Sequence, residues 1–176
     1  MSELRTNRIV PRDGLPSGSS GGIIQVRSTT FTENFSASVS GMAWTEVPGL
    51  TTTITPSRSD SKILISVTIG GIESSGLNQR MGMALRKNST NIAVNTTTGN
   101  QTPASWAGSG TNSNDIRNRA FFTHLDSPGT TSTVTYRVMI TTEGSYTMFI
   151  NRSNSNANSS SVFKTASSMT LMEISG

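Results

Sequence analysis

The chain has 176 residues, a formal net charge of +4, one histidine and no cysteine. Apolar residues make up only 32% of it, so we expect one modest core. Without cysteine, disulfides and thiolate metal sites are excluded, so we expect assembly with identical partners to add stability. No basic run indicates binding of nucleic acid, and no apolar run approaches the roughly 18 residues that suggest a membrane span. Neither nucleic-acid binding nor membrane insertion is therefore expected.

The N-terminal segment, residues 1–22, is polar and interrupted by proline and glycine. Pro11, Gly14 and Pro16 forbid a continuous helix, and the few apolar side chains are spaced as along an extended ribbon without a core of its own. This pattern predicts an arm that attaches the protein to a larger body, followed by a head over residues 23–176. The residues expected to anchor the arm are Leu4, Arg5, Arg8, Ile9, Val10, Arg12 and Leu15.

The head shows the period-two alternation of half-buried strands, separated by turn residues. The first half predicts strands over residues 22–27, 31–39, 44–47, 50–54 and 62–69, with a turn at Pro48-Gly49. A hairpin follows over residues 81–94, and residues 95–118 are expected to form a surface excursion with a helical turn after Asn114. The last predicted strands are residues 121–124, 134–141, 146–151, 162–164 and 169–174.

These strands and a composition in which Ser, Thr and Asn supply about two residues in five predict an all-β fold. The number of short strands indicates an antiparallel β-sandwich or jelly roll. Many strand edges and a thin apolar supply favour a closed assembly that covers those edges, for which we predict a homotrimer.

Catalytic and metal-binding patterns are scarce in this sequence. His124 could work with Asp126 on the same strand face, but no nucleophile elbow accompanies them, and a structural role at a strand end is favoured. No metal-binding or phosphate-binding pattern is present, so no cofactor is expected and the protein is not expected to be an enzyme. The alternative from that class is a jelly-roll polysaccharide hydrolase or lyase that uses Glu46, Glu73 or Glu143.

Two tryptophans and one loop are the candidates for recognition. Trp44, within a predicted strand, is expected in the core. Trp106 lies among small and polar residues, where it could stack on a sugar, pack at a subunit interface or close the end of its own sandwich. The Asn- and Ser-rich tract over residues 151–161 predicts a tip loop that either carries recognition or is merely solvated. The loop residues considered as contacts are Asn112, Asn154 and Asn156.

Residues 2–26 read SELRTNRIVPRDGLPSGSSGGIIQV. This segment resembles the N-terminal segment of small structural proteins of tailed bacteriophages, especially those of marine phages, in which it precedes a β-rich head. The resemblance implies a virion surface protein that is made in the host cytoplasm and contacts other virion proteins of the tail or the capsid.

Two roles on the particle stay open at this point. A tail-fibre or receptor-binding head, the role that we favour, would use Trp106 and the loops around Asn112 and Asn154 to contact host surface glycans. A capsid decoration protein, either a cement protein or a head fibre, would instead use the arm for contacts with capsomers. A free carbohydrate-binding module is a third possibility.

Overall fold

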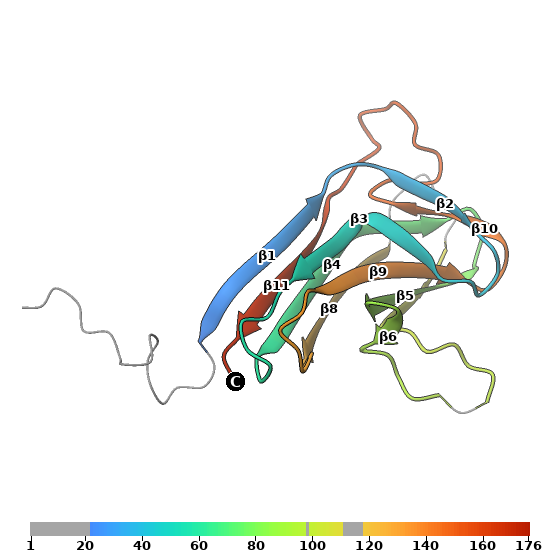
Figure 1. The fold of residues 1–176 in the computed structure, drawn as a ribbon. Helices are drawn as coiled ribbons and strands as arrows, with labels where there is room; N and C mark the ends of the chain where they lie inside the picture. The colour runs from blue at the N-terminus through green and yellow to red at the C-terminus, as the bar shows by residue number, and fades with distance from the viewer. Residues whose placement is uncertain (1–21, 98, 111–117) are drawn as a thin grey trace, which may run out of the picture.

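A computed structural model of the chain describes residues 22–97, 99–110 and 118–176. The described residues form β-strands without any helix, so the predicted all-β fold is confirmed (Figure 1). The strands are β1 (Ile23–Phe31), β2 (Phe35–Val39), β3 (Thr45–Ile54), β4 (Lys62–Ser74), β5 (Arg80–Lys87), β6 (Thr90–Ile92), β7 (Trp106–Ser109), β8 (Asn118–Asp126), β9 (Val134–Thr142), β10 (Tyr146–Ile150) and β11 (Ser167–Ile174).

Strands from the first half of the chain pair with strands from the second half in reverse order, as in one long β-hairpin. β1 pairs with β11, β3 with β9, β4 with β8, and β5 with both β6 and β7, all antiparallel. This double ribbon is folded over itself, because β11 also pairs with β4 and β9 also pairs with β5. The result is two facing sheets with the strand pairing of a jelly roll. Sheet A contains β1, β11, β4 and β8, with β10 and β2 continuing from the end of β4, and sheet B contains β3, β9, β5, β6 and β7.

The core lies between the two sheets and follows the alternation seen in the sequence. On β4, Ile63, Ile65 and Val67 point inward and are fully buried, while their neighbours along the strand point out. Met83 and Leu85 of β5 face them from sheet B. The strand predicted most clearly from its pattern is therefore the central strand of sheet A.

Several predicted boundaries were wrong, and proline explains the first of them. Residues 45–54 form one strand instead of two, because Pro48-Gly49 makes a bulge rather than a turn, and the register of β3 with β9 shifts between Glu46 and Thr51. Proline donates no hydrogen bond to a sheet, so it is tolerated where the pairing is interrupted. The Phe31 ring packs against Gly49 at this bulge, where a β-carbon would lie 2.1 Å from the ring.

The strand predicted over residues 31–39 is broken at residues 32–34. There the side-chain amide of Asn151 donates to the carbonyl oxygens of Phe31 and Glu33, at 2.8 and 3.0 Å, and so replaces strand pairing. No strand forms over residues 162–164, and Phe163 is exposed. The predicted excursion over residues 95–118 contains β7, which pairs with β5, whereas the predicted helical turn after Asn114 lies outside the described residues.

The two ends of the sandwich are defined by β1 and β11. Ile23 pairs with Ile174 at one end and Phe31 pairs with Ser167 at the other, which are about 26 Å apart at the usual rise per residue. Gly22, which follows the N-terminal segment, accepts a hydrogen bond from Ser175 at the first end. The loop of residues 151–166, between β10 and β11, lies at the opposite end (Figure 1).

Candidate functional site

The predicted anchor residues Leu4, Arg5, Arg8, Ile9, Val10, Arg12 and Leu15 lie outside the described residues, as does Asn112. Trp106, Asn154 and Asn156 are described, but they belong to different parts of the molecule. Trp106 is on β7 of sheet B, whereas the two asparagines are in the loop of residues 151–166 that leads into sheet A.

Trp106 is half-buried and packs against the core. Its ring covers Gly108, two residues along the same strand face, so closely that a β-carbon on Gly108 would lie 2.3 Å from the ring. Trp44 differs from its prediction, because it lies before β3 and outside the core. Its ring approaches Gly82 on the outer face of sheet B, where it is half-buried.

The loop of residues 151–166 is held at its base by Asn151. The Asn151 side chain is fully buried and accepts a hydrogen bond of 2.6 Å from Ser167 in addition to the two bonds that it donates to the bend after β1. Arg152 stacks over the Phe149 ring at 4.7 Å and donates to the carbonyl oxygen of Asn154 at 2.9 Å. This base gives the Asn- and Ser-rich loop a fixed attachment to the sheet.

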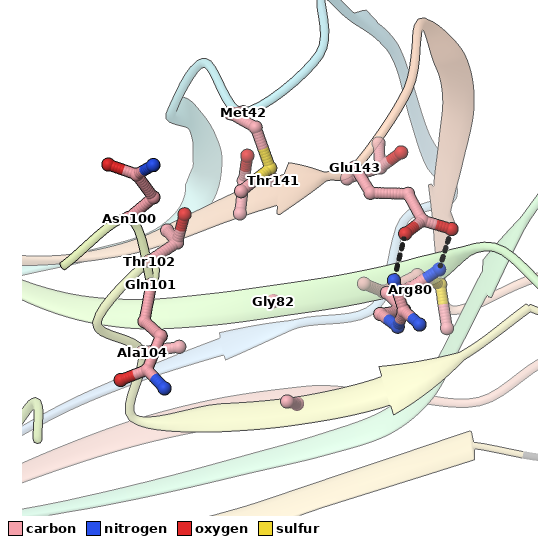
Figure 2. A pocket seen from close by; sticks show the side chains of 12 residues that line it. Met42, Arg80, Gly82, Asn100, Gln101, Thr102, Ala104, Thr141 and Glu143 are labelled. Atoms are coloured by element: carbon pink, nitrogen blue, oxygen red, sulfur yellow. Dashed lines mark hydrogen bonds and ion pairs between the residues drawn. The ribbon is translucent and has the colours of Figure 1, made fainter. Parts of the chain in front are cut away.

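A pocket of about 390 Å³ lies on the outer face of sheet B (Figure 2). Gly82 of β5 and Thr141 of β9 are paired and form its floor, since both alternate with core residues and point away from the core. Met42 borders the pocket on the side of Thr141, and Asn100, Gln101, Thr102 and Ala104 border it on another side. The sequence analysis did not predict this pocket. A glycine inside an apolar strand signals a close approach, so Gly82 was the signal that could have indicated it.

The mouth of this pocket carries an ion pair. Arg80 Nη1 lies 2.8 Å from Glu143 Oε2, and the Arg80 backbone N–H donates to Oε1 at 3.2 Å. Among the described residues that line the pocket, Arg80 is the only cation, and Glu143 compensates its charge. Thr141, in contrast, is 4% exposed and its Oγ1 atom has no hydrogen-bond partner among the described residues. A buried hydroxyl without a partner is costly unless a ligand or water satisfies it.

The glutamates considered for polysaccharide cleavage are separated by the fold. Glu46 on β3 binds Arg137 at 3.3 Å and accepts from Thr51 at 2.8 Å. Glu73 is buried on β4 and accepts from the backbone N–H of Ser74. Among the described residues that line the pocket of sheet B, only Glu143 is acidic, so no second carboxylate faces it there.

Asp126 is occupied by partners other than the predicted histidine. Its Oδ2 atom accepts from the Tyr136 hydroxyl at 2.6 Å, and its Oδ1 atom lies 2.9 Å from Lys87 Nζ. Burial and the adjacent Asp126 carboxylate raise the pKa of Tyr136, which keeps the phenol protonated as the donor. This network joins the end of β8 to sheet B and has a structural role.

Another buried acid, Glu173, braces the end of the sandwich at Gly22. Glu173 Oε1 accepts from the backbone N–H and the hydroxyl of Ser57, at 2.7 and 2.6 Å, and Oε2 accepts from the side chain of Gln25 at 2.5 Å. Burial alone would raise the pKa of Glu173, but these donors lower it to about 2. The ionised carboxylate thus ties β1, β11 and the β3–β4 loop together beside Gly22.

In the part of the chain that the structure describes, no three histidine or acidic side chains gather as a metal site. Within the same residues, none forms a helix able to cross a membrane. The sequence matches no protein-family model and no curated protein.

Proposed function

We propose that this protein is a structural component of a bacteriophage virion surface, whose N-terminal arm docks onto the particle while a trimeric jelly-roll head projects from it. The resemblance of residues 2–26 to the N-terminal segments of small phage structural proteins supports the class. The observation that carries the proposal is the separation of the two ends of the head. The chain enters at Gly22 beside a braced end, and the loop of residues 151–166 lies at the opposite end.

The anchoring role of the arm is tested by deletion of residues 2–21. We expect the shortened chain to remain folded and soluble, because the bracing contacts of Glu173 lie within residues 22–176, but to be absent from virions. Replacement of Leu4, Ile9, Val10 and Leu15 by serine should have the same effect, whereas replacement of Ser17, Ser19 and Ser20 by alanine is the matched control. Incorporation of the deleted chain at the level of the full chain would contradict the proposal.

Within this class we favour a tail-fibre or receptor-binding role over capsid decoration. The pocket of sheet B has the properties of a site for a neutral sugar, because Met42, Gly82 and Ala104 supply an apolar lining and Thr141 supplies an unpaired hydroxyl. Its volume of about 390 Å³ lies at the small end of ligand pockets. The compensated charge of Arg80 argues for a neutral rather than an acidic glycan.

Thr141→Val separates ligand binding from folding. The variant keeps the shape of the side chain and removes a buried unpaired hydroxyl, so we expect the unliganded protein to melt at the same or a higher temperature. Binding of purified protein to an array of neutral host glycans should fall at the same time. Asn154→Ala and Asn156→Ala, measured in parallel, report whether the tip loop contributes.

The outcome of the array also decides between the two roles. A decoration protein would bind no glycan and would be found over the capsid lattice, where labelling of the arm on intact particles would locate it. Cleavage of a host polysaccharide by the purified chain, lost in Glu143→Gln, would instead favour a polysaccharide hydrolase or lyase.

A further inference from the structure

The outer face of sheet A carries an unbroken row of apolar side chains. Val26 of β1 lies opposite Met172 of β11, Met172 lies opposite Leu64 of β4, and Leu64 lies opposite Leu125 of β8. Residues opposite each other in a sheet point to the same side, and Leu64, Leu125 and Met172 each alternate with more buried residues that face inward. The row therefore crosses the four strands that lie side by side in Figure 1.

The ends of this row are open to solvent. Val26 is 51% exposed and Leu125 is 47% exposed, and Phe121, four positions before Leu125 on the same face of β8, is 66% exposed. Only 32% of the residues in this chain are apolar, yet four of them lie in one row on an outer face, where they do not contribute to the core. Contiguous exposed apolar surface of this kind marks an interaction site.

The remaining side chains of the face determine which partner fits. The two rows next to the apolar row contain Ser28, Thr170, Ser66 and Thr123, and then Thr30, Ser168, Thr68 and Phe121. The charged residues of the face, Lys62 and Arg119, are at its margins. Among the described residues, the centre of the face carries small hydroxyl side chains and no charged side chain, which does not favour nucleic acid or an anionic lipid surface. It matches the composition of protein interfaces, which are depleted of charge at their centre.

The size of the face is suited to contact with another copy of this chain. Four strands at a spacing of about 4.8 Å and seven residues at about 3.3 Å cover roughly 440 Å² in projection. Because side chains protrude from the sheet, the accessible area of the face is larger than its projected area. It approaches the roughly 600 Å² per partner that the smaller specific interfaces bury. In a closed ring of copies, each copy would contribute this face and one further surface, so the total area would be larger.

We infer that the outer face of sheet A is the surface through which copies of this chain associate. This inference rests on the self-association in the proposed function and assigns it to named residues. Val26, Leu64, Leu125 and Met172 form the centre of the contact, and Phe121 lies at its border. The pocket of sheet B lies on the other side of the sandwich, away from this contact.

Sedimentation velocity of the purified full chain at up to 100 µM tests the inference. We expect an oligomer for the wild type, and a monomer for Val26→Asp combined with Leu125→Asp, two positions that are about half exposed and therefore tolerate polar side chains. Phe163→Asp is the matched control, because Phe163 is 78% exposed but lies in the loop of residues 151–166, and it should leave the oligomer intact. A monomeric wild type, or an oligomer that survives the double replacement, would overturn the inference.

A second measurement covers the possibility that the double variant does not fold. The chain contains no cysteine, so Thr123→Cys on this face and Ser159→Cys in the loop each provide a single reporter. In the folded oligomer, maleimide should label Thr123→Cys at least about tenfold more slowly than Ser159→Cys, as expected for a position that is uncovered a tenth of the time or less. Equal rates would mean that the face is open and would refute the assignment.

The arm provides the last control. The chain lacking residues 2–21 should keep the same oligomeric state, and its dissociation would assign association to the arm instead. In chains whose oligomeric state is unchanged, particle incorporation tests only the anchoring proposal, so a failure of that proposal would not be mistaken for a failure of this one.

Discussion

The buried carboxylate of Glu173 makes stability depend on pH in a way that can be calculated. Its pKa is about 2 in the folded protein and 4.5 in the reference state. The difference of about 2.5 units, at 1.36 kcal/mol each, corresponds to roughly 3 kcal/mol of folding free energy. Because the folded-state pKa is the lower of the two, this contribution is fully present above about pH 4.5. It is lost progressively as the pH falls toward 2.

The substitution Glu173→Gln isolates this contribution. An amide cannot be ionised, and its nitrogen would face either the Gln25 or the Ser57 donors that the carboxylate now satisfies. We expect the variant to be less stable than the wild type at pH 7, with a difference in free energy of unfolding that shrinks by roughly 3 kcal/mol between pH 7 and pH 2. Urea denaturation at fixed protein concentration, followed by the fluorescence of Trp44 and Trp106, measures both curves.

The control for this experiment is Glu33→Gln, which removes one exposed glutamate from the bend between β1 and β2. It should leave the free energy of unfolding at pH 7 almost unchanged. A constant difference between the wild type and Glu173→Gln across the whole pH range would refute the reasoning, because it would mean that the hydrogen bonds do not favour the ionised form.

Two further predictions concern contacts that the sequence did not reveal. Asn151→Ala removes the three side-chain hydrogen bonds at the base of the loop, so it should cost roughly 2–4 kcal/mol of stability. It should also expose residues 152–166 to proteolysis. The control Asn156→Ala, also at positive φ, should cost about 1 kcal/mol or less. Gly108→Ala forces the Trp106 ring away from the core, so it should lower the free energy of unfolding by about 1–3 kcal/mol and shift the tryptophan fluorescence to longer wavelength. The control is Gly22→Ala, where a β-carbon meets nothing within 4 Å. It should change neither the stability nor the fluorescence. Equal effects of Asn151→Ala and Asn156→Ala would contradict the first argument, and equal effects of Gly108→Ala and Gly22→Ala would contradict the second.

The fold class could be predicted because strand burial in this chain follows period two. The alternation from Ile63 to Ile69 appears in the structure as the inward face of β4, and the hairpin after Met81 forms from β5 and β6. The failures occurred where a contact from a distant part of the chain decided the local structure. Asn151 ends the pairing of β1 from 120 residues away, and the Phe31 ring occupies the bulge at Gly49.

The surfaces were harder to predict than the strands, because they depend on register. Val26, Leu64, Leu125 and Met172 are ordinary members of their own strands, and only the pairing of β1, β11, β4 and β8 places them in one row. The pocket of sheet B likewise requires Gly82 and Thr141 to be opposite each other. Trp44, which the sequence assigned to the core, illustrates the same limit, since a lone aromatic in a strand-like run does not reveal which face it takes.

The two proposals constrain each other through symmetry. In a closed cyclic assembly formed through sheet A, all copies are related by rotation about one axis, so their N-terminal segments leave at equivalent positions beside Gly22. When the strands run along that axis, every arm leaves at the same end and the pockets of sheet B face outward. Several arms that reach one particle surface together bind with higher avidity than one arm, because the second attachment is intramolecular. A weak contact by each arm, made by Leu4, Ile9, Val10 and Leu15, would then suffice to anchor the head, and the double variant of Val26 and Leu125 should reduce incorporation even with an intact arm.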